Sequence, residues 1–162
     1  MILYTPNFLD NLECNFFIDC FEEYKEKQFS VKDEVYSFRG INVINCGIDY
    51  SKVVPKVKGS YLKNRLRVQL IKEEDEVNSN FHGHSNQDNF VIFLNDNFIG
   101  GELEFSTGEI FTPKRGDMIR FENFDTHRVN PVTKGKRYTL VGLLDNNNTN
   151  KKIGILNTKR IM

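Results

Sequence analysis

Apolar residues near the N-terminus recur at steps of three and four positions. Asn7 and Asp10 stand at the beginning of this pattern, and either can cap a helix. The spacing predicts an amphipathic helix within residues 1–30. We interpret its apolar residues as the face that packs against the rest of the protein. These residues are Phe8, Leu9, Leu12, Phe16, Phe17, Cys20, Phe21 and Tyr24.

From residue 34 onwards the pattern changes to short runs that are rich in β-branched and aromatic residues. Turn sequences such as Gly100-Gly101, Thr107-Gly108 and Lys134-Gly135-Lys136 separate these runs. Many short strands with tight turns are typical of a sandwich, a jelly roll or a barrel. The predicted strands cover residues 34–46, 65–72, 89–95, 101–106, 109–112, 117–122, 126–132 and 137–144.

The length of the chain sets its domain organisation. With 162 residues, of which 39% are hydrophobic, the chain is long enough to bury one core, and we expect a single domain over 1–162. This domain would consist of a helical segment (1–30), a strand-rich core (34–144) and a polar tail (145–162) with a candidate edge strand at 153–156. No apolar run approaches the roughly 20 residues that a membrane-spanning helix needs.

Charge and cysteine content narrow the possible partners and location. The 22 basic and 22 acidic residues balance, so the chain has no global field to attract nucleic acid or an anionic membrane. Cys14, Cys20 and Cys46 form no C-x-x-C motif, and we interpret them as free thiols. Together with an N-terminus that shows no secretory signal, they indicate a reducing, cytoplasmic location.

The three histidines carry the chemistry that the sequence suggests. His82 and His84 are two residues apart, so they point to the same face of an extended chain and can reach one metal ion. His127 begins a later predicted strand. Arg137 follows ten residues beyond it in an otherwise apolar strand, where its planar guanidinium suits a carboxylate. Taken singly, each histidine is more typical of a surface residue than of a metal ligand.

The order of the motifs resembles the Fe(II)/2-oxoglutarate-dependent dioxygenases, specifically their prolyl-4-hydroxylase-like branch. The family pattern is H-x-D, a strand ending in Leu-Asn, Gly-Gly-Glu-Leu, Pro-Lys-x-Gly-Asp, a distal His, and an Arg about ten residues later. The resemblance is strong over 66–144 and weaker over 1–30, where residues 7–14 are similar to the first helix of that branch. The matching stretches are Leu94-Asn95-Asp96, Gly100-Gly101-Glu102-Leu103-Glu104-Phe105, Pro113-Lys114-Arg115-Gly116-Asp117 and His127 to Arg137.

The resemblance implies a mainly β protein with flanking helices, a double-stranded β-helix (jelly roll) whose N-terminal helix packs on one sheet. It implies that His82 and His127 bind iron, and that Arg137 and Thr139 bind the distal carboxylate of 2-oxoglutarate. The implied cofactors are Fe(II), 2-oxoglutarate and O₂, with ascorbate as reductant. The implied reaction hydroxylates a peptide or protein side chain, with peptidyl proline as the best single guess, and releases succinate and CO₂.

The third metal ligand departs from the family pattern, because His84 stands where the family has a carboxylate. The usual site has two histidines and one carboxylate on one face of the iron. Three explanations remain open. His84 can itself be the ligand, which we favour. A displaced acid can substitute, with Asp88 the nearest candidate and Asp125 the next. The position can also be unfilled, in a weak or inactive protein.

Two other functions compete with this interpretation. The first is a non-catalytic jelly-roll module that binds a metal or a peptide, which the His84 substitution favours and the retained Arg137 and Thr139 disfavour. The second is a nucleic-acid demethylase of the same superfamily. It is disfavoured because the second arginine of that group would fall within residues 141–143, which are Val-Gly-Leu.

Two further acidic features are interpreted as structural. The acidic run 73–76 is expected to be a charged loop, with a mobile active-site lid as the alternative. Asp117 of the Pro-Lys-x-Gly-Asp stretch is interpreted as a turn residue rather than a catalyst.

Overall fold

The computed structural model describes residues 2–32, 37–51, 53, 66–74, 81–83, 87–122 and 125–145. These residues contain one α-helix, α1 (Asn11–Glu23), followed by a short 3₁₀ helix at Lys25–Lys27. The strands are β1 (Leu3–Thr5), β2 (Phe29–Lys32), β3 (Ser37–Asn42), β4 (Leu66–Glu73), β5 (Gln87–Phe93), β6 (Ile99–Gly100), β7 (Leu103–Phe105), β8 (Ile110–Phe111), β9 (Met118–Glu122), β10 (His127–Val129), β11 (Val132–Lys134) and β12 (Arg137–Asp145).

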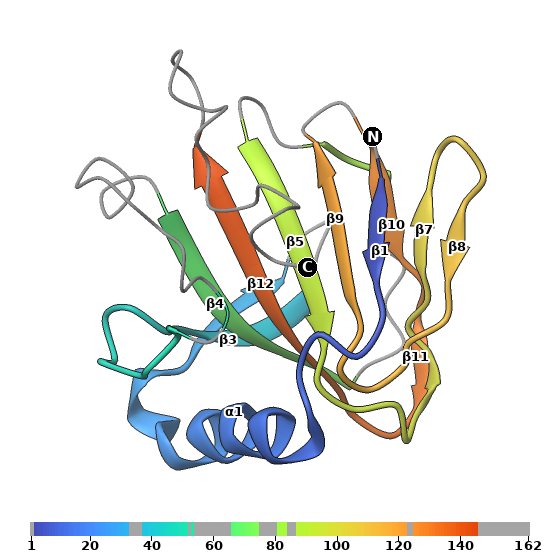
Figure 1. Ribbon diagram of the computed structural model, residues 1–162. Helices are drawn as coiled ribbons and strands as arrows, with labels where there is room; N and C mark the ends of the chain where they lie inside the picture. The colour runs from blue at the N-terminus through green and yellow to red at the C-terminus, as the bar shows by residue number, and fades with distance from the viewer. Residues whose placement is uncertain are drawn as a thin grey trace.

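Two antiparallel sheets form the body of the molecule. The larger has seven strands in the order β1-β9-β5-β12-β4-β3-β2, and the smaller has the order β10-β7-β8. In Figure 1 the small sheet stands beside β9 and β1, and α1 lies at the foot of the large sheet. Sequence neighbours such as β4 and β5 are separated by β12, so the chain crosses repeatedly within and between the sheets. This arrangement of two antiparallel sheets confirms the predicted jelly roll.

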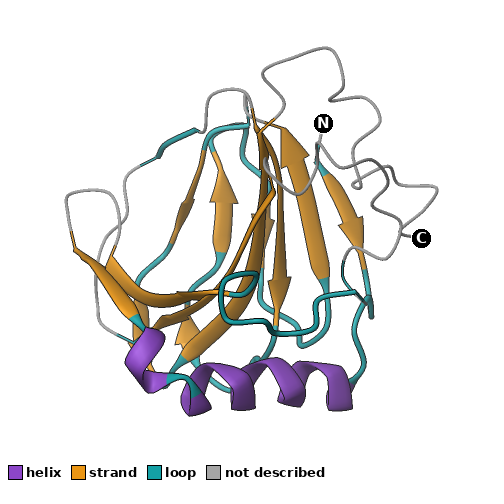
Figure 2. Ribbon diagram, turned by 90° about the vertical axis from the view of Figure 1, so that its left-hand side faces the viewer, coloured by secondary structure: helices purple, strands orange, loops and turns teal. Residues whose placement is uncertain are grey.

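Alternate residues of the central strands face two different cores, as a strand pleat requires. On β5, Phe90 and Ile92 belong to the core that also contains the buried side of α1. Val91 and Phe93 belong to a second core, which they form with Phe105 and other residues of the small sheet. We call this second core the inter-sheet interior. Figure 2 shows α1 running along one end of the strands.

Helix α1 begins where the sequence predicts. Asp10 is its N-cap: its carboxylate accepts from the backbone N–H of Glu13, and the Glu13 side chain accepts from the Asp10 backbone N–H. One expectation is wrong, because Leu12 is 79% and Phe16 45% exposed. Both lie two residues from the buried Cys14, which is about 200° around a helix of 3.6 residues per turn. They therefore point away from the core.

Strand boundaries differ from the predictions in three places. The predicted strand 34–46 is shorter, because β3 ends at Asn42 and a turn follows. The predicted strand 126–132 is two strands, β10 and β11, which pair with β7 and β6. Pro131 lies between them, and proline cannot donate to a strand ladder. β1 and β2 were not predicted. The candidate strand 153–156 lies outside the described residues.

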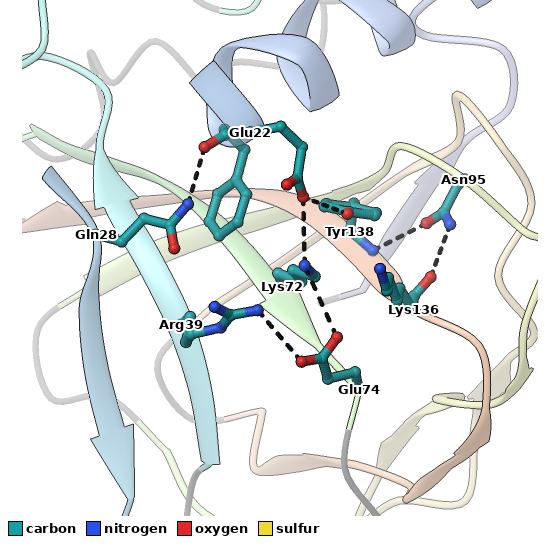
Figure 3. A network of polar contacts seen from close by, with 9 residues as sticks. Glu22, Gln28, Arg39, Lys72, Glu74, Asn95, Lys136 and Tyr138 are labelled. Carbon is teal, nitrogen blue, oxygen red and sulfur yellow. Dashed lines mark hydrogen bonds and ion pairs between the residues drawn. The ribbon is translucent and has the colours of Figure 1, made fainter. Parts of the chain in front are cut away.

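A polar network joins α1 to the large sheet (Figure 3). Lys72 of β4 is only 6% exposed, and its ammonium lies 3.3 Å from a Glu22 carboxylate oxygen and 3.7 Å from Glu74. The Tyr138 hydroxyl donates to Glu22 at 2.5 Å. A buried charge is costly unless it is paired and hydrogen-bonded. The network therefore stabilises the packing of α1 against β4 and β12.

Replacing Tyr138 by phenylalanine is expected to change the alkaline stability of the protein. Burial raises the pKa of Tyr138, and the hydrogen bond to Glu22 and its charge raise it further. The folded state keeps the hydroxyl proton while the unfolded state loses it near pH ~10, so stability falls as pH rises above that value. Tyr138→Phe should cost about 1 kcal/mol at neutral pH and show a shallower decline above pH ~10. Urea unfolding across pH 7–11 measures the free energy of unfolding of both proteins. If this free energy falls equally steeply above pH ~10 in the wild type and the variant, the role of Tyr138 is contradicted.

Gly142 of β12 leaves the space that a phenylalanine ring fills. It is the register partner of Phe90, and a Cβ at Gly142 would lie 1.9 Å from Cε2 of that buried ring. Overpacking a core costs about 1–3 kcal/mol, and we expect Gly142→Ala to lower the free energy of unfolding by about that amount. Gly47→Ala is the control, because its Cβ meets nothing within 4 Å and it bears only positive-φ strain. Chemical denaturation measures both variants, and an unchanged free energy of unfolding in Gly142→Ala would contradict the packing argument.

None of the helices in the described ranges is long and apolar enough to cross a membrane.

Candidate metal and cosubstrate site

Two of the three histidines lie side by side. His82 and His127 form an isolated antiparallel bridge in which each backbone N–H donates to the other's carbonyl at 2.9 Å. Directly opposed residues of an antiparallel pair present their side chains on the same face. Their ring centroids are 4.5 Å apart. The backbone pairing therefore places two imidazoles where one metal ion can contact both.

The surroundings of His127 set its tautomer. The residue is 6% exposed, and its ring lies 4.6 Å from the ring centroid of Phe121 and 5.8 Å from that of Phe105. Its Nδ1 lies 3.0 Å from the carbonyl oxygen of Asp125. A carbonyl can only accept, so Nδ1 carries the proton in this contact and the neutral ring has its lone pair on Nε2. This is the tautomer that ligates metals, held as such ligands usually are.

The third ligand is not placed by the structure. His84 lies outside the described residues, so its ligation remains a prediction. Within the described ranges no group of three His, Cys, Asp or Glu side chains gathers in a way that could hold a metal ion. The structure therefore brings together two of the three predicted ligands, His82 and His127, and the three-histidine site stays a prediction.

Both displaced-acid alternatives are disfavoured by position. Strand alternation places Asp88 on the same face of β5 as Phe90, which is the α1 side, and its charge acts on Arg120 of that face. His127 lies on the other side, against Phe121. The carboxylate of Asp125 accepts from the backbone N–H of Glu122 at 3.0 Å, as a turn residue does.

The predicted cosubstrate residues lie buried on the interior face of β12. Arg137 is 2% and Thr139 1% exposed. The guanidinium Nε donates to the carbonyl of Gly101 at 2.9 Å, Nη1 is paired with Glu73, and Cζ lies 5.5 Å from the centroid of the Phe93 ring. Among the residues that the structure describes, the buried Nη2 of Arg137 and Oγ1 of Thr139 have no hydrogen-bond partner.

These two atoms fit a ligand carboxylate. Residues two apart on a strand share a face, and Thr139 is the register partner of Phe93 in the inter-sheet interior. A buried polar group left without a partner costs about 1–3 kcal/mol. A carboxylate that accepts from both would remove the cost and would meet the cationic guanidinium. The residues present therefore suit the distal end of 2-oxoglutarate, as the pair of histidines suits a metal.

Gly101 lies where a side chain would collide with Arg137. Its φ is +71°, and a Cβ there would lie 2.7 Å from Cδ of Arg137 and 2.9 Å from Cε1 of Phe98. Only glycine allows this backbone to approach closely enough for its carbonyl to accept from Arg137. The sequence showed the Gly-Gly motif as a turn but not this contact.

Glu73 is a site residue that the sequence reasoning missed. The acidic run was expected to be a loop or a lid from its first residue. Instead Glu73 is the last residue of β4, opposite Arg137 in the β4–β12 register. The pairing of these two strands is not visible in the sequence, so no local signal linked the two residues.

Asp117 anchors the N-terminal segment. It is buried, and it accepts from the Tyr4 hydroxyl at 2.5 Å and from the Asn7 backbone N–H at 3.0 Å. Its carboxylate therefore holds β1 and the turn that precedes α1 against β9, a structural role rather than a catalytic one.

Sequence comparison finds a family match over the strands that carry the site. The family described as the 2OG-Fe(II) oxygenase superfamily matches residues 69–144. A curated relative, a PKHD-type hydroxylase of Hyphomonas neptunium (strain ATCC 15444), is 39% identical over 59 residues. That alignment covers 33% of this chain and 26% of the relative, so the chain matches only about a quarter of that protein's length.

Solved structures share the fold. A viral collagen prolyl hydroxylase from Paramecium Bursaria Chlorella virus-1, in its 2OG complex, is 16% identical with a TM-score of 0.62, over 88% of this chain and 94% of that one. A prolyl hydroxylase from Trichoplax adhaerens, in complex with a peptide fragment of the hypoxia inducible factor oxygen degradation domain, is 12% identical with a TM-score of 0.66, over 90% and 83%. At these identities the likeness establishes the fold.

The fold and the site define a jelly-roll protein of the kind that 2OG oxygenases form. Its segment 69–144, which carries His82, His127, Arg137 and Thr139, matches the family model of the 2OG-Fe(II) oxygenase superfamily. The resemblance that the motifs indicated is thereby confirmed.

Proposed function

We propose that the protein is an Fe(II)- and 2-oxoglutarate-dependent oxygenase. The observation that carries this proposal is the pair of buried, unpartnered atoms, Arg137 Nη2 and Thr139 Oγ1, among the described residues. They line the same inter-sheet interior whose Phe121 and Phe105 pack against His127. His82 and His127 could bind a metal, and Arg137 and Thr139 could bind a carboxylate in the same interior. This combination suits a dicarboxylate that chelates the metal.

Each site residue has a separate role in the proposed function. His82 and His127 would hold the iron, with His84 as the third ligand, and the Asp125 carbonyl keeps His127 in its ligating tautomer. Arg137 and Thr139 would bind and orient the distal carboxylate of 2-oxoglutarate, the entropic part of catalysis. Phe105 and Phe121 exclude water around His127. Bound iron and 2-oxoglutarate would supply the oxidising chemistry that uses O₂ and releases succinate and CO₂.

A peptide or protein side chain is the proposed substrate, with peptidyl proline as the first choice. The support is the naming of the fold neighbours, one a collagen prolyl hydroxylase and another a prolyl hydroxylase with a bound peptide fragment. Function does not follow from fold alone, so the substrate rests on analogy. Proline-containing peptides are accordingly the first to assay.

Anaerobic titration with Fe(II), with and without 2-oxoglutarate, tests the proposal directly. We expect the weak visible charge-transfer band of the iron chelate to appear only when both are present. Aerobic incubation with ascorbate and candidate peptides should then produce succinate. If a metal binds but the band never forms and no succinate appears, the non-catalytic binding module takes the place of the oxygenase.

Replacing His84 by aspartate tests the third ligand. If His84 ligates and the site is adapted to three histidines, His84→Asp lowers succinate formation, and this is the expected result. The aspartate restores the family's usual ligand set. A marked rise in succinate formation would instead identify the natural protein as a weakened hydroxylase with an incomplete site.

A further inference from the structure

Arg137 already has a counter-ion inside the protein. Glu73 and Arg137 are register partners on neighbouring strands, and the carboxylate of Glu73 is ion-paired with Nη1 of the guanidinium. The Arg137 side chain is 3% exposed and the Glu73 side chain 17%. An ion pair removed from water to this degree is weakly screened by salt and solvent.

The three nitrogens of the Arg137 guanidinium have different partners. Nε is committed to the Gly101 carbonyl and Nη1 to Glu73, while Nη2 has no partner within the described ranges. A ligand carboxylate can therefore reach only Nη2, together with the Thr139 hydroxyl. It would bind to the same guanidinium as Glu73, so two carboxylates would share one positive charge and repel each other.

We propose that Glu73 competes with ligand carboxylates for Arg137 and thereby lowers the affinity of the site for dicarboxylates. This inference rests on the proposed function. With no ligand bound, Glu73 neutralises a guanidinium whose burial would otherwise be costly. An incoming 2-oxoglutarate therefore meets a neutral ion pair rather than a bare cation and gains less on binding. Glu73 keeps Arg137 in place in the ligand-free protein at the expense of cosubstrate affinity.

Glu73→Gln separates this role from a purely structural one by two opposed effects. The amide keeps the shape of the side chain and can still accept a hydrogen bond, but it removes the charge. The ligand-free melting temperature should fall by a few degrees, because Arg137 loses its counter-ion. The dissociation constant for 2-oxoglutarate, measured by anaerobic calorimetry with Fe(II), should fall about tenfold, because the like charge is gone. The rise in melting temperature on adding 2-oxoglutarate should be larger than in the wild type.

Glu74→Gln is the matched control. Glu74 is the next residue and pairs with Arg39 and Lys72 in the network beside α1 (Figure 3). It should lower the melting temperature and leave the dissociation constant for 2-oxoglutarate unchanged. Thr139→Val removes the second proposed contact with the ligand. It should weaken 2-oxoglutarate binding both in the wild-type background and in the Glu73→Gln background.

The outcomes distinguish this inference from the function on which it rests. If wild type and Glu73→Gln bind 2-oxoglutarate equally, or the variant binds more weakly, Glu73 only positions Arg137 and the inference is overturned while the function stands. If neither binds 2-oxoglutarate in the presence of Fe(II), both are overturned. If only the variant binds, the competition is stronger than a tenfold effect and the inference is supported.

Discussion

Replacing Arg137 by lysine is expected to weaken 2-oxoglutarate binding by about 10- to 100-fold while the protein stays folded. Lysine keeps the positive charge but loses the planar fork that contacts the Gly101 carbonyl and Glu73 and that would bind the ligand carboxylate as well. A hydrogen bond to a charged group contributes about 1.5–3 kcal/mol, and each 1.4 kcal/mol is a factor of ten. Calorimetric titration of the Fe(II)-loaded protein with 2-oxoglutarate measures the change.

Arg39→Lys provides the control for this substitution. Arg39 is 43% exposed and pairs with Glu74 in the network beside α1. Its replacement should leave 2-oxoglutarate binding unchanged. An equal loss in both variants would indicate a general loss of stability, and no loss in Arg137→Lys would remove Arg137 from the cosubstrate site.

Replacing His127 by asparagine is expected to reduce Fe(II) affinity by more than about a hundredfold. Changing a partner that only orients a ligand typically costs about 10–100-fold in metal affinity, and His127 is proposed to be a ligand itself. Asparagine is smaller than histidine, so the surrounding Phe105 and Phe121 are not forced apart. Anaerobic equilibrium dialysis against Fe(II) gives the affinity, and circular dichroism checks that the fold is kept.

Two conservative variants test the displaced-acid alternatives in the same assay. Asp88→Asn removes the charge on the α1 side of β5, and Asp125→Asn keeps the backbone carbonyl that holds His127 Nδ1. Both should retain Fe(II) affinity. A loss comparable to that of His127→Asn in either variant would identify that aspartate as the third ligand and displace His84 from the role.

Much of the candidate site could be predicted because its signals are local. The spacing of His82, His127, Arg137 and Thr139 within turn-separated strands matched a known family pattern, and each residue falls in or beside a strand. The Asp10 cap and the start of α1 were also visible, since capping depends on residues only a few positions apart. Strand ends were less well predicted, because they depend on which neighbour each strand pairs with.

The sequence by itself determined the jelly-roll class, through the resemblance that its motifs carry, and the position of α1. It also predicted the candidate site residues His82, His84, His127, Arg137 and Thr139. Local periodicity, turn chemistry and motif order carry this information. Only the tertiary structure decided which face each residue takes and which residues meet across strands. It turned Leu12 and Phe16 outward, set Asp88 on the α1 side, and brought Glu73 to Arg137. These outcomes depend on strand register and sheet order, which arise from contacts between segments far apart in the chain.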